Sequence, residues 1–555
     1  PSISRRTSFG TPSYVDTEDT CMWGGEVVVP LLDQDQQATV QSGALQSTED
    51  AAWVRAVTPA TGDYQVRLYR HRHEANFEQI QYWTWQGDSP ATGTPLSFWR
   101  SIDKDNNEHL YGVSRAAQIA DPYNINQVYK WLHQETLDAQ GHGTYIYYLA
   151  ENTDRVDTTS SAEANRVQGA QKYLWRVCSG HPTPLDEPLS FLSTSQLASQ
   201  APDWYFETVY DYGQYDLDPS NTKPYDIPEG STWSKRQDSF SNYLPGFEIR
   251  THRLCQNVMR FHRFTTLNDA TPVLTLVYRY HYDASPICSL LSTVEDIAYY
   301  LRNGSYETQY NPPLEITYSG FQPREQEYRD ILESDSLSPF PGLGNGQPFF
   351  PVDLFNEGIE GFLYSDGTSD YYLRADWGAI NNDTPERPLT FSQVDVQMPL
   401  PVGRFQNAPQ RMLTDITANG QLDYLISKQG MTGYFEVARD EEWSSFTTLP
   451  NFPTESRNVK RHLVDVTGDG INDCLMMTYQ GLRFYRSLQQ EGYADPVLIE
   501  PFDLPEDFPI SWESSETIKI SFADMDGGGK SHLVKVTHEG LTYWPNLGHG
   551  YVGQS

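Results

Sequence analysis

The sequence predicts a mainly β protein, with a multi-strand β-sheet domain followed by part of a β-propeller. Three observations lead to this fold class. Aromatic residues make up 13% of the 555 residues and include 36 tyrosines, and aromatic side chains favour strands. Short runs of β-branched and aromatic residues recur along the first part of the chain, separated by polar turns. A four-copy internal repeat fills the last part.

The first part of the chain contains many segments of strand length. Each combines β-branched and aromatic residues and is bounded by Asp, Asn, Gly or Pro, which is typical of strands joined by turns. The clearest of these segments are Val66–Arg70, Thr144–Leu149, Tyr205–Tyr210 and Val273–Tyr280. Residues Ser292–Leu301 fit two interpretations, because their start resembles a helix cap whereas their composition equally suits a strand.

A proline- and glycine-rich segment marks the best domain boundary in the sequence. Residues 336–349 hold three prolines and three glycines, a composition typical of a linker. We therefore predict a β-rich domain over residues 1–335, a linker over residues 336–349 and propeller blades over residues 350–555. The length of 555 residues exceeds what one core usually needs, as expected for a multidomain chain.

The last part of the chain repeats one pattern four times: an Asp, a turn, an apolar pair and an aromatic pair. The copies start at Asp353, Asp415, Asp465 and Asp524, at intervals of 62, 50 and 59 residues. An aliphatic residue stands ten positions after each Asp, at Leu363, Leu425, Leu475 and Val534. The aromatic pairs are Tyr371–Tyr372, Tyr434–Phe435, Phe484–Tyr485 and Tyr543–Trp544. Units of about 50–60 residues have room for four short strands each, and radial repetition of such sheets gives a β-propeller.

Four blades are fewer than a closed propeller usually has. The chain also begins without methionine and ends on Gly553-Gln554-Ser555, directly after a strand-like segment. We therefore expect that this sequence is part of a longer polypeptide, which supplies the missing blades.

The turn of the third copy carries side-chain oxygens at positions 1, 3, 5 and 9. These positions are Asp465, Thr467, Asp469 and Asp473, a spacing similar to that of a calcium loop. Asp side chains at strand ends also accept hydrogen bonds from turn amides. Two interpretations therefore stay open: structural turns, or a calcium site at Asp465, Asp469 and Asp473. We expect no other cofactor.

Acidic residues outnumber basic ones by 74 to 39, which gives a formal net charge of −35. This balance argues against nucleic acid and anionic membranes as partners, because both attract basic surfaces. No apolar run reaches the length of a membrane span. The five cysteines are scattered and form no Cys-x-x-Cys pair, which indicates free thiols rather than a disulfide framework or a zinc site.

No convincing catalytic set emerges, and we expect no enzymatic activity. The sequence has no GxSxG, HExxH or phosphate-loop pattern. His133 and His142 lie nine positions apart, which is more typical of surface residues than of a metal site. Ser193–Ser195 with Glu325–Glu327 superficially resembles elements of ADP-ribosyltransferases. We interpret this match as coincidence, because a catalytic Glu needs a rigid strand and the Ser-rich segment has no strand character.

The densest group of charged and aromatic residues is the Trp233–Cys255 block. Within this block Glu248, Arg250 and His252 alternate with other residues and would share one face of a strand. We interpret the alternation as a cross-strand ion network that stabilises a long sheet.

Several segments resemble the SpvB-type N-terminal region of TcB, a component of bacterial Tc toxin complexes. These segments are Arg5–Tyr14, Tyr173–Val177, Trp204–Gly213, the Trp233–Cys255 block and Pro313–Tyr318. The repeats resemble the FG-GAP/VCBS-like middle region of the same component, and Tyr543–Gly548 is similar to a blade end there. The resemblance runs in order along nearly the whole chain.

The resemblance implies a role in packaging and translocation rather than in catalysis. In this family TcB joins TcC to form a shell, built largely of YD/RHS-like strands, that encloses a cytotoxic effector. The propeller closes one end of the shell, docks on the pentameric TcA channel and opens as a gate. The resemblance thus implies TcC and TcA as partners, without direct membrane insertion. It also implies a bacterial product made in the cytoplasm and released within an insecticidal toxin complex.

Two alternatives stay open. SpvB itself shares the N-terminal region and is an ADP-ribosyltransferase whose catalytic domain follows a proline-rich linker. The chain would then be the delivery region of such a toxin, and the intact protein would consume NAD. Calcium loops would instead suit an adhesive propeller similar to those of integrins or lectins, whose stability would depend on calcium.

Overall fold

The chain divides into two compact units, Pro1–Tyr318 and Ser319–Ser555. The computed structural model describes residues 1–31, 37–41, 44–45, 63–73, 77–86, 96–160, 162–164, 166–192, 203–268, 271–319, 350–356, 358–365, 370–377, 389–395, 411–428, 431–437, 443–453, 461–478, 480–510, 512, 515 and 517–555. The predicted linker over residues 336–349 lies outside the described residues. The prediction of a mainly β fold is confirmed, since strands make up most of the regular structure in both units.

Eight antiparallel strands of the first unit close into a barrel. Their pairing runs β1–β2–β3–β6–β7–β8–β9–β11 and returns from β11 to β1. The strands are β1 (Ser2–Arg5), β2 (Cys21–Trp23), β3 (Glu26–Pro30), β6 (Tyr64–His71), β7 (Gln79–Trp85), β8 (Ser97–Ile102), β9 (Glu108–Tyr111) and β11 (Val128–Leu137). Closure leaves this ring without a free strand edge.

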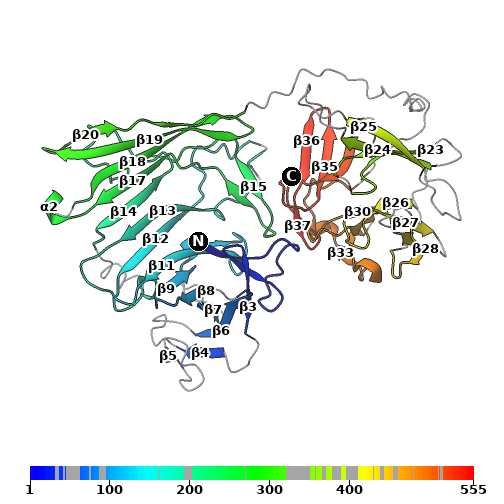
Figure 1. Cartoon of the computed structure of the whole chain (residues 1–555), viewed down its shortest axis with the longest axis horizontal. Coiled ribbons are helices and arrows are strands. Elements are labelled where there is room, and N and C mark those ends of the chain that lie inside the picture. The colour runs from blue at the N-terminus through cyan, green and yellow to red at the C-terminus, as the bar shows by residue number, and fades with distance from the viewer. Residues whose placement is uncertain are drawn as a thin grey trace. The chain divides into compact units, whose positions relative to one another are not determined.

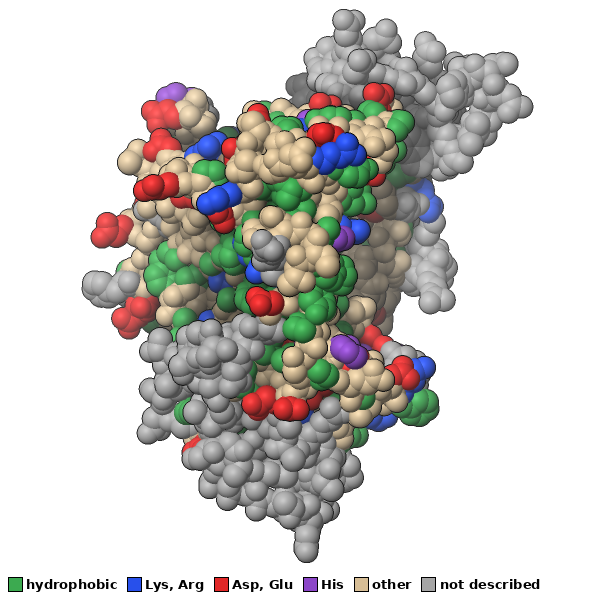
Figure 2. Space-filling model, turned by 90° about the vertical axis from the view of Figure 1, so that its left-hand side faces the viewer, with side chains coloured by type: hydrophobic (Ala, Val, Ile, Leu, Met, Phe, Trp, Pro, Cys, Tyr) green, Lys and Arg blue, Asp and Glu red, His purple; other side chains and the backbone are tan. Residues whose placement is uncertain are grey.

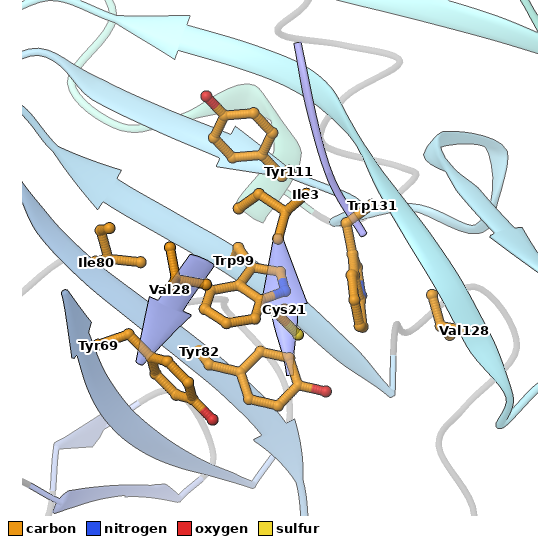
Figure 3. Packing of buried hydrophobic residues seen from close by; sticks show 10 residues of the cluster. All are labelled: Ile3, Cys21, Val28, Tyr69, Ile80, Tyr82, Trp99, Tyr111, Val128 and Trp131. Atoms are coloured by element: carbon orange, nitrogen blue, oxygen red, sulfur yellow. The ribbon is translucent and has the colours of Figure 1, made fainter. Parts of the chain in front are cut away.

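Alternation of side chains along the strands fills the barrel with aromatic residues. Strand β7 directs Ile80 and Tyr82 into the same core as Trp99 of β8 and Trp131 of β11, as Figure 3 shows. Tyr82 and Trp99 lie 4.5 Å apart between ring centroids. The intervening residue Trp83 belongs to a second core on the opposite face of the same strands. These strands are therefore buried on both faces.

A long antiparallel sheet extends from the barrel through β11. The pairing continues β11–β12–β13–β14–β17–β18–β19, and β19 also pairs with β20 and β21 (Figure 1). These strands are β12 (Gly143–Ala150), β13 (Lys172–Ser179), β14 (Phe206–Asp211), β17 (Asn257–His262), β18 (Val273–Ala284), β19 (Ser289–Arg302), β20 (Ser305–Tyr310) and β21 (Leu314–Glu315). Residues Ser292–Leu301, for which the sequence allowed a helix or a strand, thus lie in strand β19.

Short elements complete the first unit. They are β4 (Gln37–Gln41), β5 (Ala44–Leu45), β10 (Gln118–Ala120), β15 (Phe240–Asn242), β16 (Ile249–Thr251), the 3-10 helices η2 (Arg115–Ala117) and η3 (Leu189–Phe191), and α2 (Thr265–Asn268). The carboxylate of Glu135 in β11 holds η3. It accepts hydrogen bonds from the Leu189 amide at 2.7 Å and from the amide and hydroxyl of Ser190 at 2.8 and 2.6 Å.

The second unit contains four successive antiparallel sheets, one for each sequence repeat. The first is β22 (Phe350–Val352), β23 (Gly361–Ser365), β24 (Asp370–Trp377) and β25 (Leu389–Asp395). The second is β26 (Arg411–Thr414), β27 (Asp423–Lys428), β28 (Met431–Phe435) and β29 (Thr447–Thr448). The third is β30 (Arg461–Val464), β31 (Asp473–Thr478), β32 (Gly481–Tyr485) and β33 (Val497–Ile499). The fourth is β34 (Lys519–Ala523), β35 (His532–Thr537) and β36 (Gly540–Trp544).

The remaining elements of the second unit are the 3-10 helices η5 (Gln489–Glu491) and η6 (Pro501–Asp503) and the hairpin β37 (Asn546–Gly548) with β38 (Tyr551–Val552). Consecutive sheets share cores. Leu413 and Trp443 of the second sheet pack against Leu363 and Tyr372 of the first. Further cores join the second sheet to the third and the third to the fourth.

The shared register of the four sequence copies has a direct structural counterpart. The aliphatic residue ten positions after each Asp lies opposite the aromatic residue nineteen positions after it. The four cross-strand pairs are Leu363 with Tyr372, Leu425 with Tyr434, Leu475 with Phe484, and Val534 with Tyr543. All four aliphatic side chains are buried. The repeat therefore encodes the core pair between the second and third strands of each sheet.

The distribution of charge can be followed on one face of the molecule. On the face shown in Figure 2, basic side chains are dispersed among acidic and apolar ones and form no continuous patch. Within the described part of the chain, no helix has the length and hydropathy that crossing a membrane would require.

Candidate functional sites: repeat turns and an ion network

The three carboxylates of the predicted calcium loop are engaged by backbone amides of their own turn. Asp465 follows β30, and its two oxygens accept hydrogen bonds from the amides of Gly468 at 2.6 Å and Gly470 at 2.9 Å. Asp469 accepts one from the Ile471 amide at 2.9 Å. These bonds wrap the turn around its first carboxylate, as expected for a structural Asx-type turn.

Asp473, the first residue of β31, links this turn to the residues that follow β32. One carboxylate oxygen accepts the amides of Val466 and Thr467 at 3.1 Å, and the other accepts the Ser487 amide at 2.9 Å. The side chain is fully buried, and this burial raises the pKa of its carboxyl to about 6 against the opposing effect of the amide bonds. A calcium ion at Asp465, Asp469 and Asp473 would have to compete with these amides, and calcium binding there stays a prediction.

The second repeat builds the same turn from equivalent residues. Asp415 accepts the amides of Asn419 and Gly420, at 3.3 and 2.9 Å. Asp423 accepts those of Ile416 and Thr417, at 2.8 and 3.2 Å, and its carboxyl pKa is also raised to about 6 by burial. The two Asp positions therefore have the same structural role in both copies.

The turn of the fourth repeat brings two carboxylates and a histidine close together. Ligand atoms of Asp524, Asp526 and His532 lie within 4.8 Å of one another, the single such grouping in the described part of the chain. The amide of Met525 donates to the His532 ring at 3.2 Å, and Asp524 accepts the Gly529 amide at 2.8 Å. These atoms also serve the local turn, and exposed acidic groups often gather without an ion.

A buried lysine, which sequence reasoning missed, belongs to the same turn. Lys530 is 1% exposed, and burial lowers the pKa of its ammonium to about 8. The charges of Asp526, Asp465 and Asp524 oppose this shift. The Ser531 amide beside it donates to the Asp465 carbonyl at 3.0 Å, which links the third and fourth turns. The equivalent positions of the second and third copies are Gln421 and Ile471. The lysine in the fourth copy is thus the sequence signal that could have pointed to this residue.

The ion network around the Trp233–Cys255 block differs from the predicted cross-strand ladder. Arg250 and His252 both contact Glu163, and Arg166 donates to Glu248. Their partners thus come from a connection before β13, whereas β16 itself pairs only with the short strand β15 among the described residues. The prediction of a structural network holds, but its partners were wrong because alternation in sequence cannot identify contacts with distant loops.

A buried ion pair anchors the end of this block. Arg253 Nε donates to Glu151 Oε1 at 2.9 Å, and both side chains are fully buried. Tyr173 also donates to Glu151, at 2.5 Å, and the amide of His252 donates to it at 2.9 Å. Every charged group at this point has a partner, as the cost of burying charge demands. The arrangement is that of a structural anchor.

The remaining candidates do not assemble into a site. His142 contacts Asp138 at 3.1 Å, whereas His133 contacts Thr136 within β11 at 2.9 Å, so the two histidines have separate partners. Ser193–Ser195 and Glu325–Glu327 lie outside the described residues. All five cysteines are free thiols.

Comparison with known proteins separates the first unit from the rest of the chain. Residues 1–264 match the family described as Salmonella virulence plasmid 65kDa B protein, SpvB. The mono(ADP-ribosyl)transferase SpvB of Salmonella typhimurium is 36% identical over 305 residues, which cover 54% of this chain and 47% of that protein. SpvB of Salmonella dublin matches to the same extent, with 46% of its length covered. The chain thus spans about half the length of the curated relatives it matches.

Solved structures extend the similarity to the whole chain. A chain of the Photorhabdus luminescens Tc holotoxin pore superposes with a TM-score of 0.78 at 29% identity, covering 100% of this chain and 24% of that one. The TcdB2-TccC3 structure has the same fold, with a TM-score of 0.58 at 22% identity and 30% of its chain covered.

The N-terminal part of this chain is an SpvB-type region. Within that class it is TcB-like, because the match to a Tc holotoxin chain covers all of this chain and not only the SpvB-type region. The likeness supports the class of a Tc toxin subunit of the TcB type, of bacterial origin.

Proposed function

We propose that the chain is the N-terminal part of a TcB-type subunit that encloses a toxic effector together with a TcC-type partner. The observation that carries this proposal is the superposition of all 555 residues on a Tc holotoxin chain at 29% identity. The closed barrel and the long sheet would contribute to the wall of the shell. In this role the subunit packages and delivers a protein and performs no catalysis.

The four repeated sheets would form part of a propeller that acts as the gate of the shell. The register shared by the four core pairs supports radial repetition, because each sheet then presents equivalent faces to its neighbours. The gate would dock on a TcA-type channel, through which the effector leaves. Release of the assembled toxin from the bacterium follows from this role.

Reconstitution with the partners tests the proposal. The full-length natural polypeptide is co-expressed with a TcC-type protein, and the mass of the product is measured by light scattering during size-exclusion chromatography. We expect a stable complex of the two, which then binds an immobilised TcA-type channel. A full-length polypeptide that stays alone under these conditions would refute the proposal.

The similarity to SpvB supports a second candidate, the delivery region of an ADP-ribosyltransferase toxin. SpvB is 36% identical to this chain over 305 residues. NAD consumption distinguishes the two functions, because only the transferase produces nicotinamide. The full-length polypeptide, purified without TcC, is expected to leave NAD intact if the TcB-type function is right.

A further inference from the structure

A pocket on the long sheet combines two arginines with four aromatic rings. It has a volume of about 300 Å³. Its arginines are Arg176 of β13 and Arg263, which directly follows β17, and its rings belong to Tyr147, Trp175, Trp204 and Tyr225. The volume lies at the lower end of the range for small-molecule sites.

An irregularity in strand β13 places an aromatic ring and a cation side by side. Tyr147 lies opposite Arg176, whereas Tyr148 lies opposite Leu174, so Trp175 is the extra residue in the ladder. Such an insertion re-aims side chains that would otherwise alternate between faces. The guanidinium of Arg176 consequently stands 4.3 Å from the Trp175 ring centroid and 4.5 Å from that of Tyr225.

The two arginines share one buried carboxylate. Glu207, which is 5% exposed, accepts hydrogen bonds from Arg263 Nη2 at 3.0 Å and from the Tyr225 hydroxyl at 2.8 Å. Arg176 Nη1 lies 3.5 Å from the same carboxylate. The remaining acidic neighbour, Asp203, is largely exposed and 3.7 Å from Arg263, so solvent screens its charge. The pocket therefore holds two guanidiniums and two carboxylates, of which only Glu207 is buried beside both arginines.

One donor group of each arginine has no acceptor among the described residues, although Arg176 also donates to the Tyr225 hydroxyl and, at 3.4 Å, to the Tyr215 hydroxyl. The Nε atoms of Arg176 and Arg263 are buried and form no hydrogen bond within the described part of the chain. A buried donor without an acceptor is costly, and native proteins usually satisfy it with a ligand, an ion or water. Here two such donors stand beside a cavity with aromatic walls.

We propose that this pocket binds a small aromatic anion, with a carboxylate or phosphate group accepting from the unpaired guanidinium Nε donors and a planar ring against the aromatic walls. Guanidinium forks match both oxyanions in geometry and charge. The aromatic rings favour a flat apolar group over a bare inorganic ion. This binding site is independent of the assembly proposed above.

Fluorine NMR of the whole chain tests the site directly. The probes are 4-fluorobenzoate and 4-fluorophenyl phosphate, with 4-fluorobenzyl alcohol as the neutral match. We expect saturable line broadening for one or both anions and none for the alcohol. The stronger anion identifies the preferred oxyanion. The proposal would be overturned if neither anion showed line broadening, or if the neutral alcohol were broadened as much as the anions.

Substitutions of the two arginines test whether the anion binds in this pocket. Arg263→Gln should weaken anion binding at least about tenfold, because a charge-assisted hydrogen bond is lost. The matched control is Arg302→Gln, an exposed arginine of β19 paired with Glu307, which should bind as the parent does. Arg176→Lys keeps the charge but loses the fork, so it should weaken binding without unfolding the sheet. Unchanged affinity in a folded Arg263→Gln or Arg176→Lys protein would rule the pocket out.

Discussion

Single buried carboxylates organise both units of this protein, each by collecting several backbone donors. Asp473 accepts two amides of its own turn and the Ser487 amide after β32, and Glu135 accepts two amides and a hydroxyl of η3. In both cases one side chain satisfies donors that would otherwise be buried without an acceptor. The loss of such a residue should therefore cost far more than the loss of one hydrogen bond.

Replacement of Asp473 tests this reasoning in the second unit. Asp473→Ala should lower the free energy of unfolding by about 3 kcal/mol, because three amides lose their acceptor in a buried site. The control Asp469→Ala removes one amide bond in a neighbouring position and should cost about 1 kcal/mol or less. Urea unfolding followed by tryptophan fluorescence measures both. Equal losses would contradict the structural role of Asp473.

The melting temperatures of the parent protein and of an Asp465→Ala variant test the calcium interpretation. If Asp465, Asp469 and Asp473 act only as turn residues, millimolar calcium should leave the melting temperature of the parent unchanged. A bound ion would instead raise it, and Asp465→Ala would abolish that increase. Differential scanning fluorimetry with calcium and with a chelator separates the two outcomes.

Glu135 should make the stability of the first unit dependent on pH. Burial raises the pKa of its carboxyl from 4.5 to about 7. Between these values the folded protein retains a proton that the unfolded chain has lost, so this contribution to stability is full below pH 4.5 and falls as pH rises towards 7. The shift corresponds to a loss of order 3 kcal/mol.

The contribution of Glu135 is measured as the difference in unfolding free energy between the parent and the Glu135→Gln variant at each pH. Denaturant unfolding of the parent and of Glu135→Gln is followed from pH 4 to pH 8. The variant should be less stable at low pH, and the gap should narrow towards neutral pH because the amide does not titrate. Parallel curves would show that Glu135 does not take up a proton on folding.

At the scale of the element, the third repeat sheet depends on a close contact between the backbones of β32 and β33. Gly481 begins β32 with a φ of +131°, and a Cβ there would lie 2.1 Å from the carbonyl oxygen of Ile499. Gly481→Ala should therefore separate β32 from β33 and cost about 2–4 kcal/mol.

Gly470, in the turn between β30 and β31, provides a control for the effect of a positive φ alone. It also has a positive φ, +83°, but a Cβ would meet no atom within 4 Å. Gly470→Ala should thus cost only the backbone strain, about 1–2 kcal/mol. Equal effects in urea unfolding would mean that the approach to Ile499 does not constrain β32.

Local sequence patterns predicted the elements well where the information is local. The ten- and nineteen-residue offsets of the repeat became cross-strand core pairs, and the strand segments Val66–Arg70 and Val273–Tyr280 lie in β6 and β18. Periodicity alone left Ser292–Leu301 undecided, and pairing with strands on both sides makes it β19.

Features that depend on contacts between residues far apart in the chain could not be predicted from local sequence patterns. Barrel closure joins β1 to β11, and the partners of Arg250 and Arg253 come from residues about 90–100 positions earlier. The irregularity at Trp175 depends on the ladder with β12. No local spacing encodes such contacts, since they arise from the packing of the whole unit.

At the scale of the whole molecule, two units with separate cores should unfold separately. Differential scanning calorimetry is expected to show two transitions. Glu135→Gln should shift one of them and Asp473→Ala the other, because these residues lie in different units. A single transition that moves in both variants would show that the units are one cooperative body.

Closure of the barrel by its earliest strand has a consequence during synthesis. Ser2 of β1 pairs with Leu132 of β11, so roughly 130 residues must be translated before that edge of β1 finds its partner. At about 5–20 residues per second, the ribosome needs on the order of ten seconds for this stretch. Throughout that interval the nascent chain carries an incomplete ring of aromatic strands with open edges. Successful production of this protein should therefore depend on chaperones that shield the nascent barrel until β11 emerges.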